Sequence, residues 1–279
     1  NKDKVMDTLG VSVCENSKRK AILFYDTEQS EVQTYKNITN LLRRCGRETM
    51  PEYLKAYCLT GMSRKERLQA IIQSMDKFHY QFRGIHIVVI DGIADLIKGA
   101  NDETESIAVV EELYRLAGIY NTCIVTILHF IPSGLKLRGH LGSELQRKAA
   151  AILSIEKDTD PSVSVVKALK VRDGSPLDVP IMQFAWDKDA GMHVYLGEKP
   201  KEEKEKRKED ELVAVARDIF GRQDFITYVD LAEQIQAILD VKERTAKSYI
   251  KFMREKEIIR KDPSNQSYYI IGNLKQAGL

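Results

Sequence analysis

Three residues able to do acid–base or metal chemistry follow apolar stretches of this chain. Asp91 ends one apolar stretch, Glu28 stands two residues past the end of a second, and His129 ends a third. A carboxylate can hold a divalent cation or take a proton from water, and a histidine exchanges a proton near neutral pH. If the stretches are neighbouring parallel strands, their carboxyl ends lie at one edge of the sheet, where open α/β sheets bind ligands. The pattern therefore predicts a ligand site built from all three side chains.

The stretch that ends at Asp91 contains four consecutive branched apolar residues, Ile87 to Ile90. Such a run, without polar alternation, is typical of a strand buried on both faces in a parallel sheet covered by helices. Residues 21–26 and 122–128 form similar runs. We therefore expect three buried parallel strands. An aspartate at the end of a strand also commonly caps the next turn, which is the alternative for Asp91.

Segments with apolar residues at helical spacing lie between these strands. Residues 31–45 and 104–119 are predicted to be helices, and a third helix begins at Ser63, where Glu66 completes the spacing of a capping box. Because strands alternate with helices, we expect a doubly wound α/β domain. Further strands are predicted over residues 53–59, 150–156 and 163–170, and in a hairpin over 181–196 that turns at 189–191.

A second, smaller domain is predicted at the C-terminal end. Residues 198–210 carry interleaved charges of both signs, which is typical of a linker or a solvated helix and not of a nucleic-acid tail. Residues 211–279 then follow the order helix, helix, short turn, helix and hairpin, which is the layout of a winged helix-turn-helix domain. The predicted elements are helices over 211–220, 228–239 and 242–256 and a hairpin over 258–271.

The third of these C-terminal helices carries polar and basic residues away from its apolar stripe. Such residues contact DNA phosphates and base edges, so we expect this helix to bind DNA. Winged helices also serve as protein-binding modules, and that alternative stays open. The candidate DNA-contacting residues are Lys242, Arg244, Thr245, Lys247 and Lys251.

Composition narrows the class of protein. The chain has 279 residues, 43% of them hydrophobic, which is enough for two folded domains. Its formal net charge of +2 predicts no global attraction to nucleic acid or membrane, so any basic surface must be local. The four cysteines form no Cys-x-x-Cys pair, which favours reduced thiols in the cytoplasm over a zinc site or a disulfide framework. No apolar run approaches the ~20 residues that a membrane span needs.

The order of these motifs resembles a known family. Residues 21 to about 195 are similar to the RecA-like P-loop ATPase core, in particular to the RepA-type hexameric helicases of plasmids and mobile elements. The resemblance implies a mostly parallel sheet with helices on both faces over residues 1–197, a charged linker over 198–210 and a winged helix over 211–279. It is carried by Leu-Phe-Tyr-Asp-Thr-Glu-Gln at 23–29, Ile-Val-Val-Ile-Asp-Gly at 87–92, Thr-Ile-Leu-His at 126–129 and Lys-Val-Arg-Asp-Gly at 170–174.

The resemblance also implies a role for each motif. Glu28 would be the general base that polarises the attacking water, and Asp91 would hold Mg²⁺ through water. His129 would sense the γ-phosphate of ATP, and Lys170 and Arg172 would reach the nucleotide of a neighbouring subunit in a ring, by implication a hexamer. Each residue has a structural alternative. Glu28 would cap the following helix, His129 would be a buried, hydrogen-bonded histidine, and Lys170 and Arg172 would be an exposed strand end.

The resemblance further implies a DNA-contacting loop. Residues 131–142 are rich in glycine and basic residues and are expected to form a mobile loop. Lys136, Arg138 and His140 are its candidate contacts with DNA.

The sequence departs from the family at one motif. No Gly-x-x-x-x-Gly-Lys-Ser/Thr occurs in the chain, although that motif supplies the backbone and lysine that hold the phosphates. Because the chain begins at Asn1, we expect that this motif precedes Asn1 in a longer protein, and that these 279 residues alone bind ATP weakly and do not hydrolyse it. The alternative is a natural degenerate ATPase.

Two functions follow from the sequence. The first is a DNA-dependent ATPase of the RepA-like helicase type that acts in replication or mobilisation of a mobile element, with ATP, Mg²⁺ and DNA as ligands. The second is a DNA-binding regulator or excision accessory protein that has no enzymatic activity and retains the ATPase scaffold.

Overall fold

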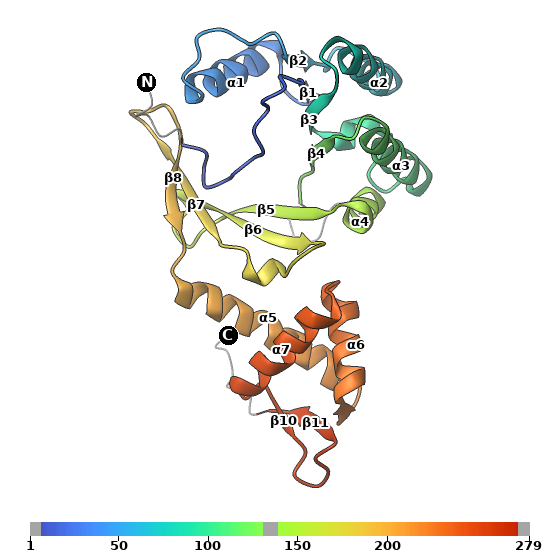
Figure 1. Ribbon diagram of the computed structural model, residues 1–279, viewed down its shortest axis with the longest axis vertical. Helices are drawn as coiled ribbons and strands as arrows, with labels where there is room; N and C mark the ends of the chain where they lie inside the picture. The colour runs from blue at the N-terminus through green and yellow to red at the C-terminus, as the bar shows by residue number, and fades with distance from the viewer. Residues whose placement is uncertain (1–6, 131–138, 273–279) are drawn as a thin grey trace. The chain divides into compact units, whose positions relative to one another are not determined.

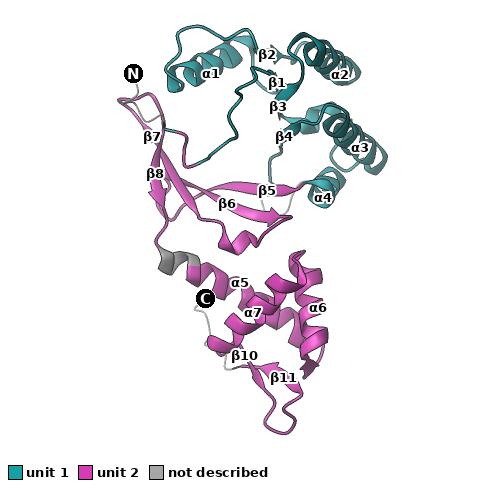
Figure 2. Cartoon of the chain, viewed as in Figure 1, with its two compact units in different colours: residues 1–7, 11–149 teal, residues 8–10, 150–279 magenta. Residues whose placement is uncertain are grey.

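The computed structural model describes residues 7–130 and 139–272, with side chains left out at 201–204. The chain divides into two compact units, one of Asn1–Asp7 and Val11–Ala149 and the other of Thr8–Gly10 and Ala150–Leu279 (Figure 2). This division falls at Ala149 and not within the predicted linker 198–210, so the strands after Ala149 group with the C-terminal helices.

The first unit is built on a parallel sheet of four strands in the order β2-β1-β3-β4. All four strands lie where the sequence predicted strands. They are β1 (Ala21–Asp26), β2 (Leu54–Cys58), β3 (Ile85–Asp91) and β4 (Cys123–Ile127). The helices that connect and follow them are α1 (Glu31–Arg44), α2 (Arg64–Gln81), α3 (Glu103–Ile119) and α4 (Gly139–Lys148), with a short 3-10 helix η1 (Ile93–Leu96) after β3.

The order of the strands puts helices on both faces of this sheet. From β1 the chain moves outward to β2 through α1, and then returns past β1 to β3 and β4 through α2 and α3. Because such crossovers are right-handed, the two directions place α1 on one face and α2 and α3 on the other, as Figure 1 shows. The direction reverses between β1 and β3, and ligands bind at this kind of switch point.

Only one face of the parallel sheet is fully buried. Leu23, Val88 and Ile90 are inaccessible to solvent and pack with α2 and α3. On the opposite face, Val125 and Ile127 of β4 are 40% and 42% exposed. The prediction of burial on both faces is therefore wrong for β4, whereas Ile87 and Val89 of β3 are half-buried on this face. Among the described residues β4 is an edge strand, and no helix of the core covers this side of it.

The second unit begins with an antiparallel sheet whose strands follow chain order. It is separate from the parallel sheet, although the sequence predicted one mostly parallel sheet over residues 1–197. The hairpin with its turn at 189–191 is confirmed. The strands are β5 (Ala151–Lys157), β6 (Val163–Val171), β7 (Met182–Asp187) and β8 (Met192–Glu198), with a 3-10 helix η2 (Pro176–Asp178) between β6 and β7.

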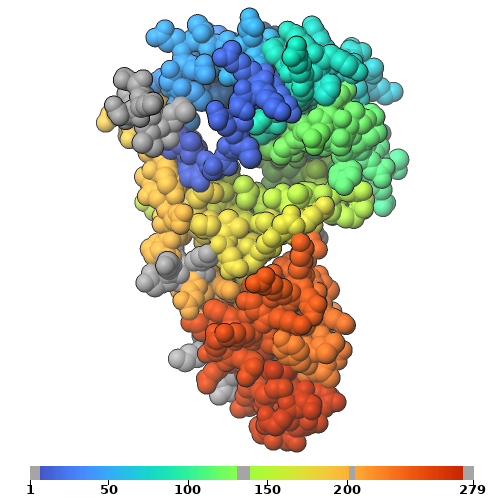
Figure 3. Space-filling view, viewed as in Figure 1, coloured from blue at the N-terminus to red at the C-terminus, as the bar shows by residue number. Residues whose placement is uncertain are grey.

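Three helices and a small sheet complete the second unit. Their core includes Leu212, Ile235 and Met253, all inaccessible to solvent. Figure 3 shows the orange and red atoms of this region closely packed. The elements are α5 (Lys201–Phe220), α6 (Tyr228–Leu239) and α7 (Glu243–Glu255) with strands β9 (Ile226–Thr227), β10 (Ile259–Lys261) and β11 (Tyr268–Ile271), paired in the order β10-β11-β9.

Two helices differ from the sequence prediction. Helix α5 starts at Lys201 and not at Glu211, so most of the predicted linker is helical. Lysine and glutamate are good helix formers, and an i,i+4 ion pair between Arg207 and Glu211 supports the helix further. Helix α4 occupies residues 139–148, part of which was predicted as loop. Burial of Leu141 offsets the weak helix propensity of its glycines.

Candidate functional site

The turn after β1 is organised by the carboxylate of Asp26, which is completely buried. It accepts hydrogen bonds from the backbone N–H groups of Glu28 (3.1 Å) and Gln29 (2.9 Å) and from the Thr34 hydroxyl (2.8 Å). These three bonds tie the end of β1 to the first turn of α1. Glu28 is therefore held at the carboxyl end of the sheet and does not extend the strand.

Thr27 joins the ends of β1 and β3. Its backbone N–H donates to the carbonyl of Asp91 at 3.0 Å, and its hydroxyl lies 2.9 Å from that carbonyl and 2.8 Å from the carbonyl of Gly92. Gly92 has a φ of +90°, and a Cβ there would lie 2.3 Å from the Thr27 hydroxyl oxygen and 2.5 Å from Cγ of Glu28. Glycine is therefore required for this close approach.

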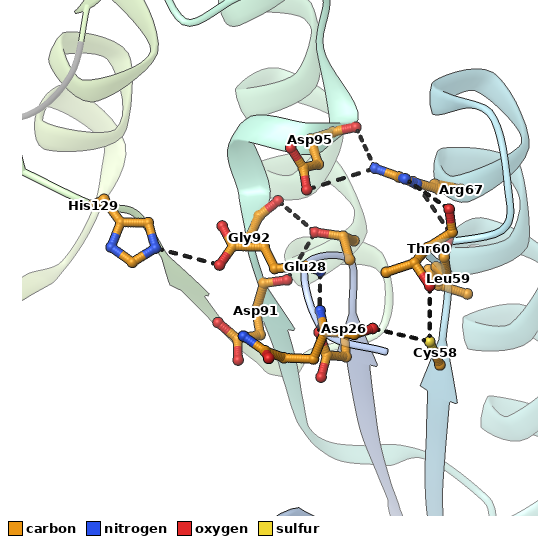
Figure 4. A network of polar contacts seen from close by, with 12 residues as sticks. Asp26, Glu28, Cys58, Leu59, Thr60, Arg67, Asp91, Gly92, Asp95 and His129 are labelled. Atoms are coloured by element: carbon orange, nitrogen blue, oxygen red, sulfur yellow. Dashed lines mark hydrogen bonds and ion pairs between the residues drawn. The ribbon is translucent and has the colours of Figure 1, made fainter. Parts of the chain in front are cut away.

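His129, two residues past the end of β4, lies next to Glu28. Its Nε2 lies 3.3 Å from Oε2 of Glu28, with the histidine side chain 76% exposed and the glutamate side chain 28% exposed. In Figure 4 His129 approaches Glu28 from the side opposite to Arg67. The structure thus brings Glu28, Asp91 and His129 together at one edge of the sheet. Because His129 is exposed, its alternative as a buried structural histidine does not apply.

The edge carries an excess of negative charge. Partial burial raises the pKa of Asp91, the charges of Asp26 and Glu28 raise it further, and His129 lowers it in part. A cation bound here would relieve the same repulsion. Among the described residues no three or more His, Cys, Asp or Glu side chains form a cluster able to hold a metal ion directly. The carboxylates are suited to hold Mg²⁺ through water. The 279 residues contain no phosphate-binding Gly-x-x-x-x-Gly-Lys-Ser/Thr motif.

Sequence reasoning missed Arg67 on the other flank of this edge. Its guanidinium donates to the carbonyls of Leu59 (3.1 Å) and Thr60 (3.3 Å) after β2, and to the carbonyl of Asp95 in η1 (3.3 Å). It also lies 3.7 Å from the Asp95 carboxylate. Arg67 therefore braces two loops that border the site. Its position in the first turn of α2 gave no signal of this role.

A groove of about 580 Å³ opens beside the site, between α1 and β2. Cys58 lines it, and the Cys58 thiol donates to the carbonyl of Gln29 at 3.3 Å. Thr34, which bonds Asp26, lines it as well. The groove therefore shares its wall with the β1–α1 turn, but Glu28 and Asp91 do not line it.

Lys170 and Arg172 belong to the second unit, at the end of β6. Nζ of Lys170 lies 2.6 Å from the carboxylate of Asp240, and the backbone N–H of Arg172 donates to the carbonyl of Ala150 at 2.8 Å. The role of both residues at the nucleotide of a neighbouring subunit stays a prediction.

The predicted DNA-contacting residues lie in two places. Lys136 and Arg138 fall outside the described residues, and His140 is exposed in the first turn of α4. Helix α7 buries Ala246, Tyr249, Ile250 and Met253 and turns its cations to solvent, with Thr245 half-buried. Three of these cations have carboxylate partners in the structure: Lys242 with Asp173 (3.0 Å), Lys247 with Glu243 (2.6 Å) and Lys251 with Glu255 (3.8 Å).

Comparison with models of known protein families and with curated proteins gave no match. In the described part of the chain no helix has both the length and the apolar composition needed to cross a bilayer.

Replacing Gly92 with alanine should destabilise the first unit. The left-handed backbone costs alanine about 1–2 kcal/mol, and the contacts of the new Cβ with Thr27 and Glu28 add to this. Gly118→Ala is the matched control, because Gly118 lies in α3 with no atom near a new Cβ, and it should stabilise the helix by about 0.5–1 kcal/mol. Urea unfolding of both variants measures the difference. Equal effects at the two positions would contradict the assigned contacts.

Neutralising the two aspartates of the site should have opposite effects on stability. Asp26→Asn should lower the free energy of unfolding by about 2 kcal/mol, because a buried acceptor of three hydrogen bonds is weakened. Asp91→Asn should raise the thermal midpoint at pH 7 by about 1–3 °C, a range kept small because solvent screens the group.

The effect of Asp91→Asn should depend on pH. The pKa of Asp91 is raised in the folded state, so the folded protein binds this proton more tightly than the unfolded chain and loses stability as the carboxyl ionises. The gain from Asp91→Asn should therefore be largest near pH 7. It should vanish below about pH 3, where the carboxyl is protonated in both states. Thermal melts of wild type and variant across this range test the sign, and a gain independent of pH would exclude the charge explanation.

Proposed function

We propose that this chain is part of a DNA-dependent ATPase of the RecA-like class, similar to RepA-type hexameric helicases, which acts in replication or mobilisation of a mobile element. The main support is the contact of His129 with Glu28 at the switch point of the parallel sheet, beside Asp91. Three side chains from three strands meet there in the order that the resemblance requires. The parallel sheet with helices on both faces is compatible with a RecA-like core.

In this proposal Glu28 takes the proton from the water that attacks the γ-phosphate of ATP. The hydrogen bonds to Asp26 fix its backbone, and Gly92 leaves room for its side chain. His129 touches the Glu28 carboxylate and therefore links the position of this base to the chain that follows β4. Mg²⁺, held through water at Asp91, would supply positive charge at the phosphates. Arg172 would act on a neighbouring subunit, a role worth about 10³–10⁵ in rate for such fingers.

The proposal requires a phosphate-binding loop in addition to these residues. The outer edge of β4 is a suitable place for the strand that precedes such a loop. Among the described residues β4 pairs only with β3, and its exposed Val125 and Ile127 would be covered by further structure. Unpaired apolar edges of this kind are normally covered or blocked in stable proteins.

We assign DNA binding to the C-terminal helices in the same proposal. Helices α6 and α7 are joined by a short turn, and β10 and β11 form a hairpin after them, which fits a winged helix-turn-helix. Helix α7 presents Arg244, Lys247 and Lys251 to solvent while its other side is buried. This is the arrangement expected of a recognition helix.

A second candidate function is a DNA-binding regulator without enzymatic activity. Two observations favour it. The 279 residues contain no Gly-x-x-x-x-Gly-Lys-Ser/Thr motif, and α7 is a complete helix with one buried side. ATP hydrolysis separates the two candidates.

The ATPase proposal predicts a loss of hydrolysis in Glu28→Gln. In the protein expressed from its complete reading frame, this change should lower the DNA-stimulated rate by about 10²–10⁴, because the general base is lost. Glu31→Gln, an exposed glutamate in the first turn of α1, is the control and should leave the rate unchanged. Phosphate release with and without DNA is the measurement. An unchanged rate in Glu28→Gln would refute the role of Glu28, and no hydrolysis by the wild type would favour the regulator.

Both candidates predict that α7 contacts DNA. In the 279-residue chain, Arg244→Ala should weaken binding of duplex DNA by about 1–3 kcal/mol if Arg244 reaches a base edge. Lys247→Ala should reduce the slope of log K against log salt by about 1 if Lys247 contacts a phosphate. Fluorescence anisotropy at several salt concentrations measures both. Lys36→Ala on exposed α1 is the control, and equal losses in all three variants would indicate non-specific attraction.

A further inference from the structure

Two crossed ion pairs connect the Lys-Val-Arg-Asp segment to the turn between α6 and α7. Nζ of Lys170 lies 2.6 Å from Oδ2 of Asp240, which is the residue that ends α6. Nζ of Lys242, which precedes α7, lies 3.0 Å from Oδ1 of Asp173. Each side therefore contributes one lysine and one aspartate. Lys242, which is proposed to bind DNA, and Lys170, which is proposed to act at a nucleotide, therefore belong to one charged cluster.

The same segment is anchored to the helices just beyond this cluster. The hydroxyls of Ser175 and Tyr249 form a short buried hydrogen bond, and Leu177 in η2 is 2% exposed within the core of α5, α6 and α7. Nζ of Lys208 lies 3.6 Å from the carboxylate of Asp178. The residues that follow Arg172 therefore make direct contacts with α5 and α7.

The two ion pairs differ in how easily another ion can replace one of the partners. Lys242 and Asp173 are 71% and 86% exposed, so solvent and salt compete strongly for this pair. Lys170 is only 14% exposed, and its stem is covered while its ammonium group faces Asp240. A phosphate can replace Asp173 at Lys242 with little cost. Lys170 has less freedom to find another partner.

We propose that these crossed ion pairs form a latch through which DNA bound at α7 controls the segment that carries Lys170 and Arg172. The latch rests on the proposed DNA-binding role of α7. A DNA phosphate at Lys242 displaces the Asp173 carboxylate and repels both Asp173 and Asp240. Asp240 then holds the Lys170 side chain less firmly, and the residues after Arg172, which lie beyond the pairing of β6 with β5, gain mobility. By linkage, opening the latch must in turn strengthen binding of DNA.

Neutral variants of the two aspartates test the latch in the 279-residue chain. Asp173→Asn removes the competitor for Lys242, and Asp240→Asn removes the carboxylate that pairs with Lys170. Asparagine tolerates the left-handed backbone of Asp240, whose φ is +50°, so the turn is kept. Asp224→Asn is the control. It changes the net charge equally, and Asp224 is exposed with no ion pair or side-chain hydrogen bond among the described residues.

Two measurements are made with one short duplex DNA of mixed sequence. Anisotropy should show about two- to fivefold tighter binding for Asp173→Asn than for Asp224→Asn, the range expected for loss of one exposed ion pair. Hydrogen exchange of peptides covering 170–175 should rise in the wild type when DNA is added. In the Asp173→Asn/Asp240→Asn double variant the exchange should already be fast without DNA.

The outcomes separate the latch from the function on which it rests. Wild-type protein that binds no DNA at low salt would overturn the DNA-binding proposal and the latch together. Binding by the wild type, with affinity and exchange in the double variant equal to those of Asp224→Asn, would overturn the latch alone. Tighter binding with no change in exchange at 170–175 would also overturn it, because Asp173 would then be only a competitor for phosphate.

Discussion

The buried carboxylate of Asp26 is the interaction on which the candidate site depends. It joins the end of β1 to the first turn of α1 through two backbone N–H groups and the Thr34 hydroxyl. A buried charge is stable only when such donors surround it, so the turn has little freedom. Glu28 stands within this turn, and the direction of its side chain follows from it. The close approach at Gly92 completes the constraint from the side of β3.

Electrostatics separates the two flanks of the sheet edge. On one flank Arg67 is paired with Asp95 and with three loop carbonyls, so its charge is used in holding the loops. On the other flank partial burial raises the pKa of Asp91, the charges of Asp26 and Glu28 raise it further, and the exposed His129 lowers it in part. A protein keeps such repulsion, at a cost in stability, where a ligand supplies the missing positive charge. The excess of acid at the switch point is therefore the strongest physical argument for a site.

Local patterns predicted most elements of the chain and failed where burial depended on a neighbour. The capping box at Ser63 and the hairpin turn at 189–191 formed as expected, because both are decided by a few adjacent residues. The extent of α5 was missed, because interleaved charges are equally typical of a linker and of a solvated helix. The exposure of Val125 in β4 was also missed, because an apolar residue has the same pattern in a central strand and at an edge.

The sequence by itself determined which polar residues end the strands and the order in which they occur, since strand ends are marked by local changes from apolar to polar residues. It could not determine that Nε2 of His129 meets the carboxylate of Glu28, which stands 101 positions earlier in the chain. That contact required β3 to lie between β1 and β4 in one parallel sheet. Strand order depends on long-range packing and not on local propensity, so only the tertiary structure decided it. The same holds for the crossed ion pairs of Lys170 and Lys242, which join residues that no local pattern relates.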